Sequence, residues 1–128
     1  MRLLLDTHAL VWWIRESPHL SAGARAAISA DGAAIWVSPI SAWEIAIKVG
    51  KGQWPEAKEL LAEFESAIAA EGFEQLSITV PHVRLAGLMV SDHRDPFDRL
   101  LAAQAILDGL TLVTADGKLQ ALGVACLW

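Results

Sequence analysis

The chain has 128 residues, of which 54% are hydrophobic and 20% charged, a composition that excludes an intrinsically disordered protein. Its length suits one domain, residues 1–128. The net charge of −5 argues against tight, non-specific binding to nucleic acid through a basic face, but it allows an enzyme whose acidic residues hold metal ions against phosphates. The single cysteine, Cys126, excludes an intramolecular disulfide and a cysteine-based zinc site.

The sequence contains no segment typical of membrane insertion or export. No apolar run approaches the roughly 18 residues of a membrane span. Met1 and Arg2 lead directly into a strand-like segment, without the basic region or the small-residue cleavage site of a signal peptide. We therefore expect a cytoplasmic protein that has no membrane partner.

Strand-like and helix-like segments alternate along the chain, which is typical of α/β proteins. The run Leu3, Leu4 and Leu5 is apolar without alternation, as expected of a central strand covered on both faces. The expected strands are residues 3–5, 34–37, 75–78, 110–113 and 124–127. The expected helices are residues 8–15, 21–30, 38–50, 55–70, 81–89 and 95–108. The sequence predicts a three-layer α/β/α sandwich around a mostly parallel, five-stranded sheet.

Four acidic residues fall where such a sheet would gather them at one edge. Asp6 and Asp116 follow expected strands, whereas Glu44 and Asp98 lie in helices that leave strand ends. Ligand sites of open parallel sheets form at the carboxyl ends of the strands. Each residue also has a structural explanation: Asp6 caps a helix, Glu44 pairs with Lys48, Asp98 complements a helix dipole and Asp116 forms a turn.

The types of residue in this set restrict the ligand that they can bind. Carboxylates without a cysteine or histidine motif suit hard cations, so we expect Mg²⁺ or Mn²⁺. The four histidines lack ligand spacing, and we expect them to be surface or packing residues; they are His8, His19, His82 and His93. The chain has neither a glycine-rich phosphate loop nor a serine nucleophile elbow.

Four segments of the chain match a known family in order. They are LLLDTH at residues 3–8, SAWEI at 41–45, HRDPFDRLLAAQA at 93–105 and LVTAD at 112–116. Together they resemble the acidic motifs of PIN-domain proteins, specifically the VapC-type toxins of bacterial toxin–antitoxin pairs. The resemblance spans nearly the whole chain, and the segment Asp95-Pro96-Phe97-Asp98-Arg99 is its most specific part.

The resemblance implies a fold, an activity and partners. It implies a metal-dependent endoribonuclease that forms a homodimer and is held inactive by a small antitoxin. The family's acidic residues carry over to Asp6, Glu44, Asp98 and Asp116 as catalytic and metal-binding residues, with Thr7 and Thr114 in support. Bound Mg²⁺ or Mn²⁺ would activate a water molecule and clamp the scissile phosphate of the RNA.

Other residues near these motifs are candidates for contact with partners. Four basic residues are candidates for binding RNA phosphates: Lys48, Lys51, Arg94 and Arg99. Among the six tryptophans, we expect Trp36 and Trp43 in the core. Trp12 and Trp13 are adjacent and cannot face one direction on a helix, so we expect at least one on a partner surface, such as an antitoxin groove.

Three alternatives can be compared on the residues themselves. A phosphotransfer receiver domain would have a second acidic residue directly after Asp6, and a haloacid-dehalogenase-type phosphatase would have an aspartate at position 8; the chain has Thr7 and His8. The remaining alternative is a non-catalytic PIN-fold binding module, against which the presence of all four carboxylates weighs.

Overall fold

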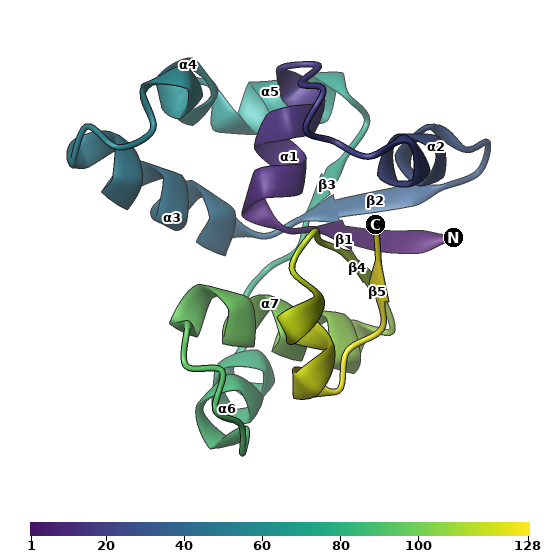
Figure 1. Ribbon diagram of the computed structural model, residues 1–128, viewed down its shortest axis with the longest axis vertical. Helices are drawn as coiled ribbons and strands as arrows, with labels where there is room; N and C mark the ends of the chain where they lie inside the picture. Colours follow the sequence, from purple (N-terminus) through teal and green to yellow (C-terminus); the bar gives the residue numbers. More distant parts are fainter.

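A computed structural model describes all residues, 1–128, and contains one parallel five-stranded sheet (Figure 1). The strands are β1 (Arg2–Leu5), β2 (Ala34–Val37), β3 (Glu74–Gln75), β4 (Thr111–Val113) and β5 (Cys126–Leu127). Their order is β3-β2-β1-β4-β5, and every neighbouring pair is parallel. The prediction that residues 3–5 form the central strand is therefore confirmed.

Helices cover both faces of this sheet, which confirms the three-layer arrangement. The first group is α1 (Thr7–Ile14), α2 (Ala22–Ser29), α3 (Pro39–Gly50), η1 (Pro55–Ala57), α4 (Lys58–Ala62) and α5 (Phe64–Ala70). The second group is α6 (Val80–Leu88), α7 (Pro96–Asp108) and η2 (Gly117–Leu122). Figure 1 shows the first group in the upper half of the molecule and the second in the lower half. No helix is long and apolar enough to cross a membrane.

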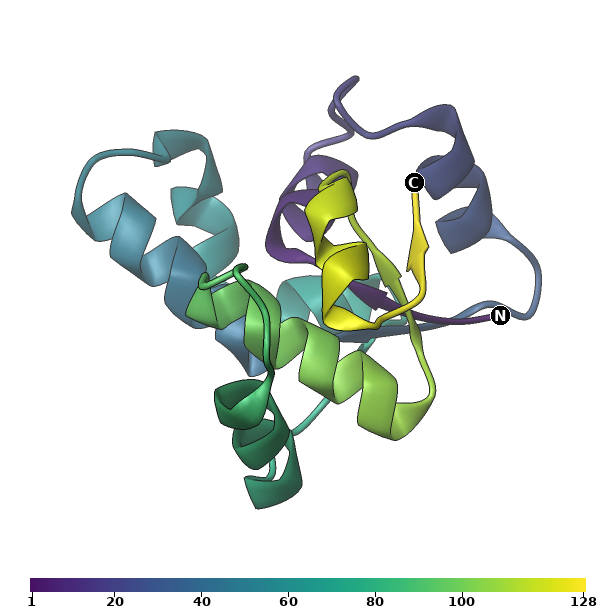
Figure 2. The same cartoon turned by 60° about the horizontal axis from the view of Figure 1, so that its bottom comes forward.

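Alternate side chains of β1 enter two separate cores. Leu3 and Leu5 pack in the core beneath α1, α2 and α5, whereas Leu4 packs with α7 and η2. All three leucines are completely buried, which explains why the strand is a continuous apolar run. In Figure 2, α7 lies along the second face of the sheet and α6 packs outside it.

Local capping sets the helix starts that frame the sheet edge. Ser38 accepts a hydrogen bond from Ile40 N, with Pro39 at the first helical position of α3. Asp95 caps α7 in the same way, accepting from Phe97 N and Asp98 N. Gly109, at φ 67°, ends α7 in the left-handed conformation and turns the chain into β4.

The structure departs from the predicted elements in four places. The helix expected at residues 55–70 is divided into η1, α4 and α5, with non-helical backbone at Glu63. Its buried residues are Ala57, Leu60, Phe64 and Ile68, which all enter the core beneath α1, so the break does not change which side of the segment is buried. In addition, β3 and β5 are shorter than expected, and η2 was not predicted.

Candidate active site

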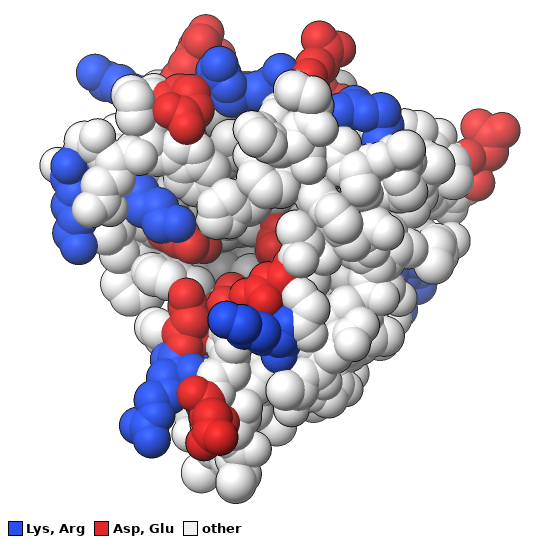
Figure 3. Space-filling model, viewed as in Figure 1, with Lys and Arg blue, Asp and Glu red and all other residues white.

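A cavity of about 350 Å³ opens at the carboxyl edge of the sheet. It is lined by Asp6, Thr7, His8, Trp12, Glu44, Lys48, Asp95, Asp98, Ala115 and Asp116. The four predicted carboxylates therefore surround one space, although they are far apart in the sequence. Figure 3 shows acidic side chains gathered in a hollow near the middle of this face, with basic side chains beside them.

Asp6 lies deepest, between the end of β1 and the start of α1. Its side chain caps α1 by accepting a hydrogen bond from Ala9 N at 2.8 Å, and the residue is 8% exposed. Burial raises the pKa of Asp6 to about 6, and the negative charges of Asp98 and Glu44 add to this rise. Asp6 therefore serves as a cap and also belongs to a group of mutually repelling carboxylates.

The two predicted supporting threonines make different contacts. Thr114, which is buried after β4, lies beside Asp6 and lowers the pKa of its carboxyl, and its Oγ1 accepts a hydrogen bond from Asp116 N at 3.1 Å. It thus lies between two of the four acidic residues. The hydroxyl of Thr7 instead bonds Ser41 Oγ at 3.0 Å and joins α1 to α3. Thr7 lines the cavity but supports the site through helix packing.

Glu44 enters the cavity from α3 and pairs with a lysine one turn later. Its carboxylate lies 3.2 Å from Lys48 Nζ, and the Glu44 side chain is 12% exposed. The pair predicted as a structural alternative therefore exists, but inside the cavity wall and not on a solvated rim. Lys48 also lies over the ring of Trp54, 5.1 Å from its centroid. This position holds a positive charge next to the carboxylates.

Asp98 and Asp116 form the tightest cluster together with a histidine. Ligand atoms of His93, Asp98 and Asp116 all lie within 4.8 Å of one another. His93 Nε2 is 2.8 Å from Asp98 Oδ2. Burial raises the pKa of Asp98, and the hydrogen bond from His93 opposes that rise. Asp116 is exposed and caps η2 by accepting from Lys118 N.

A second hollow, of about 630 Å³, continues from the first. The two share Asp95, Asp98 and Asp116, and the second also has Arg94 and Lys118 in its wall. Lys118 was missed at the sequence level because a lone lysine after a turn has no distinguishing pattern. Lys51, which ends α3, lines neither hollow. Among the basic residues predicted to bind RNA phosphates, Arg94 and Lys48 line the two hollows, whereas Lys51 does not.

Arg99 is held by the backbone, so its contact with RNA stays a prediction that the structure does not favour. Its guanidinium donates to the backbone carbonyls of Ala86, Met89 and His93. These bonds fix the connection between α6 and α7 and use all three guanidinium nitrogens. Arg99 therefore stabilises the connection that leads from α6 to Asp98.

The histidines also need correction, because two of the four belong to the site. His93 contacts Asp98, and His8 lines the cavity, where partial burial and the charge of Lys48 lower its pKa. His82 is a buried packing residue, as predicted, with Nε2 2.5 Å from Asp108 Oδ2. His19 is exposed and lies against Trp12, so it is a surface residue, as predicted.

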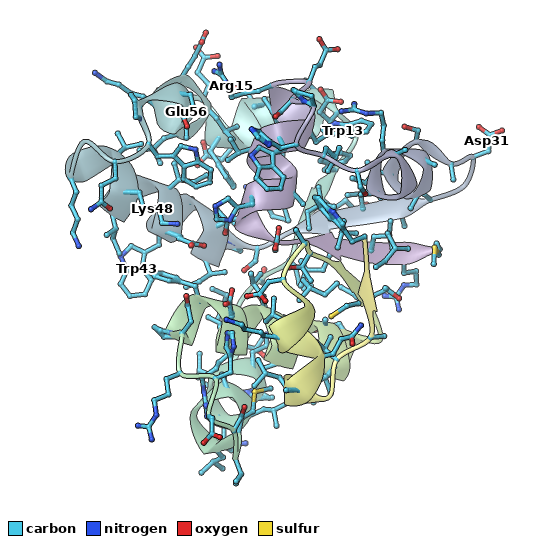
Figure 4. All side chains as sticks on the ribbon, in the orientation of Figure 1. Trp13, Arg15, Asp31, Trp43, Lys48 and Glu56 are labelled. Atoms are coloured by element: carbon cyan, nitrogen blue, oxygen red, sulfur yellow. The ribbon has the colours of Figure 1, made fainter.

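The tryptophan predictions are partly wrong. Trp43 is 59% exposed and not in the core; it lies at the edge of α3 against Phe97 (Figure 4). Glu44 lines the cavity and Ala42 packs against the core beneath α1, so the side chain at position 43 lies on the outer side of α3. Trp12 and Trp13 are both half-buried and diverge as expected: Trp12 lines the cavity, whereas Trp13 packs on Phe73.

The donor set fits a hard divalent cation. Four carboxylates face one cavity, no thiolate is present, and burial with like charge makes the ionised forms of Asp6 and Asp98 unfavourable without a counter-charge. A divalent cation would offset this repulsion. The residues that could hold it are Asp6, Glu44, Asp98 and Asp116.

Comparison with known proteins agrees with this geometry. The profile of the PIN domain family matches residues 3–125. Ribonuclease VapC22 of Mycobacterium tuberculosis is 35% identical over 120 residues, which span 92% of this chain and 89% of that protein.

Solved structures share the fold at low sequence identity. The toxin VapC20 of Mycobacterium tuberculosis, described as cleaving the sarcin–ricin loop, superposes with a TM-score of 0.69 at 15% identity, covering 96% of both chains. The VapBC2 complex of Rickettsia felis, bound to a promoter DNA fragment, gives a TM-score of 0.66 at 16% identity, covering 98% of this chain and 97% of that one. The profile match and the relationship to VapC22 show that this chain belongs to the PIN domain family and is a VapC-type member of it.

Proposed function

We propose that this protein is a metal-dependent endoribonuclease that acts in the cytoplasm as the toxin of a toxin–antitoxin pair. The observation that carries the proposal is the convergence of Asp6, Glu44, Asp98 and Asp116 on one cavity. The sequence relationship to a VapC ribonuclease supports RNA as the substrate. The alternative, a non-catalytic PIN-fold binding module, has no need of buried carboxylates that repel one another.

The chain's own residues have separate roles in this proposal. The four carboxylates would hold Mg²⁺ or Mn²⁺, and a bound ion supplies Lewis-acid stabilisation of the phosphate and acidifies water. Thr114 lies beside Asp6 and lowers the pKa of its carboxyl, which favours the ionised form that a cation needs. Lys48 places a positive charge at the cavity wall, and Arg94 and Lys118 extend this charge along the adjoining hollow. These cations would hold the RNA backbone on both sides of the scissile phosphate.

The proposal is tested by removing one charge from the cavity. Asp98→Asn keeps the side-chain shape but removes a carboxylate, so we expect cleavage of RNA with Mg²⁺ to be abolished while the fold remains. Asp31→Asn is the matched control, because Asp31 is exposed at the far edge of the molecule (Figure 4). If the Asp98→Asn protein cleaves RNA as fast as the Asp31→Asn protein, the assignment is wrong.

An antitoxin site is proposed where α1 meets α4. A groove of about 450 Å³ there is lined by Ile14, Arg15, Glu56, Glu59, Leu60, Glu63 and Ala67. Figure 4 shows Arg15 and Glu56 side by side at this junction, with Trp13 near the same end of α1. Three glutamates beside apolar residues suit a basic, amphipathic segment. One of the solved neighbours is a toxin–antitoxin complex from Klebsiella pneumoniae.

The antitoxin proposal is checked by binding. We expect Glu59→Lys to weaken antitoxin binding and make it less sensitive to salt, with Asp31→Lys as the control. Trp12→Ala and Trp13→Ala test whether the antitoxin also contacts the aromatic residues of α1 beside this groove. If all of these variants bind the antitoxin like the parent, the groove is not its site.

A homodimer is proposed through the outer face of α6 and α7. The exposed apolar residues of this region are Val80, Val83, Leu88, Val90, Ile106 and Leu107. Several exposed apolar side chains on two packed helices are typical of an interface, and a two-fold dimer would cover them. We expect light scattering to give a dimer at micromolar concentration and Val83→Glu to give a monomer. A monomeric parent would contradict the proposal.

A further inference from the structure

A chain of hydrogen bonds leads from the end of α6 to the carboxylate of Asp98. We propose that Arg99 and His93 are positioning residues that fix Asp98 for metal binding, with His93 acting directly on the carboxylate and Arg99 acting through His93. This inference rests on the proposed function, because it concerns the affinity of the same site for its ion. Neither residue stood out by spacing or periodicity in the sequence.

Arg99 forms the base of this chain. Its Nε donates to the Ala86 carbonyl at 2.9 Å, its Nη1 to the His93 carbonyl at 3.0 Å, and its Nη2 to the Met89 carbonyl. The carbonyls of the last turn of a helix have no partner within the helix, and Ala86 and Met89 lie at the end of α6. Arg99 therefore ties that end to the first turn of α7. A lysine has one nitrogen and cannot reproduce this planar set of contacts.

The backbone of His93 is held on both sides. Its N–H donates to Ser91 Oγ at 3.1 Å, and its carbonyl accepts from Arg99. A fixed backbone restricts where the imidazole can point. The ring meets Asp98, with Nε2 2.8 Å from Oδ2, and the side chains are only 15% and 22% exposed.

The contact leaves one oxygen of the carboxylate available. No hydrogen bond reaches Asp98 Oδ1, while Oδ2 is held by His93. Hydrogen bonds to a ligating carboxylate fix its orientation, and loss of such an outer contact typically lowers metal affinity by about 10- to 100-fold. Asp98 also belongs to the cluster with Asp116. A fixed Asp98 reduces the reordering that ion binding would otherwise require.

A direct ligand role for His93 makes a different prediction. An imidazole ligand favours transition ions over Mg²⁺, so its loss would weaken Mn²⁺ binding more than Mg²⁺ binding. A positioning role weakens both ions to a similar degree, because the affected ligand is the carboxylate of Asp98. The existing Nε2–Oδ2 hydrogen bond favours the positioning role.

The experiment is calorimetric titration of the full chain with Mn²⁺ and separately with Mg²⁺. We expect His93→Ala to weaken both ions by about tenfold or more. His93→Gln retains an N–H donor and should recover most of that loss. His19→Ala is the control, because His19 stacks on Trp12 outside the carboxylate cluster, and it should bind both ions like the parent. Thermal melting of each variant checks that it is folded.

The role of Arg99 is tested in two backgrounds. Arg99→Lys should weaken ion binding in the parent but cause little further loss in the His93→Ala protein, because contacts in one network are not additive. Equal losses in both backgrounds would overturn the route through His93. If His93→Ala binds like the parent, or weakens Mn²⁺ much more than Mg²⁺, the positioning role is wrong while the proposed function stands. If the parent binds neither ion, both proposals fail.

Discussion

The burial of Asp6 predicts an unusual dependence of stability on pH in the metal-free protein. The pKa of this carboxyl rises from 3.8 to about 6 on folding. The folded state therefore binds a proton more tightly than the unfolded state, so the contribution of this carboxyl to stability is highest below about pH 4, falls between about pH 4 and 6, and is constant at higher pH. A rise of about 2 units corresponds to about 3 kcal/mol at about 1.4 kcal/mol per unit.

Asp6→Asn removes the titration while retaining the cap. Asparagine caps a helix about as well as aspartate, and its amide oxygen can accept the hydrogen bond from Ala9 N. We therefore expect Asp6→Asn, in the presence of chelator, to be more stable than the parent by about 3 kcal/mol at pH 8. The difference should shrink to nearly zero at pH 4, where the aspartate is protonated.

Urea denaturation at several pH values measures this difference. Asp95→Asn is the matched control, because Asp95 caps α7 but is exposed, so its effect should be small at both ends of the range. Titrations common to parent and variant cancel in the difference. A pH-independent difference, or an Asp6→Asn protein less stable than the parent at pH 8, would refute the reasoning.

Other outcomes follow from the same structure. Mn²⁺ at a hundredfold above its dissociation constant should stabilise the parent by about 2.7 kcal/mol, and Asp6→Asn should lose most of this gain in thermal melting; no shift at millimolar Mn²⁺ would rule out high-affinity binding. Leu4→Ala should lower the free energy of unfolding by about 2–5 kcal/mol, because Leu4 is completely buried in the α7 core. A urea midpoint for Leu4→Ala equal to that of the parent would contradict this packing.

Much of the fold could be predicted because local and tertiary signals agree. The buried run at Leu3–Leu5 identified the central strand, and Ser38-Pro39 and Asp95-Pro96 marked two helix starts. The break at Glu63 carries no proline or glycine, so no local pattern predicts it. The apolar spacing continues through it, since Leu60, Phe64 and Ile68 enter one core.

The carboxylates of the site were predictable for the same reason. The contacts of His93 and Arg99, which hold Asp98 in place, were not predictable. Asp6 and Asp116 follow strands, and parallel strands bring their carboxyl ends to one edge. His93 lies in a connection, and its contact with Asp98 depends on how that connection folds back. The carbonyls that occupy Arg99 come from α6 and the loop after it, which no local pattern around position 99 reveals.

The chemistry of the RNA ends tests the central claim most directly. Purified parent protein is incubated with RNA and Mg²⁺, and the new ends are identified by ligation and sequencing. Attack by water activated at a metal site predicts 5′-phosphate and 3′-hydroxyl ends, and none when chelator replaces Mg²⁺. Ends with 2′,3′-cyclic phosphate and 5′-hydroxyl groups, or cleavage that persists in chelator, would contradict a carboxylate-held metal as the basis of catalysis.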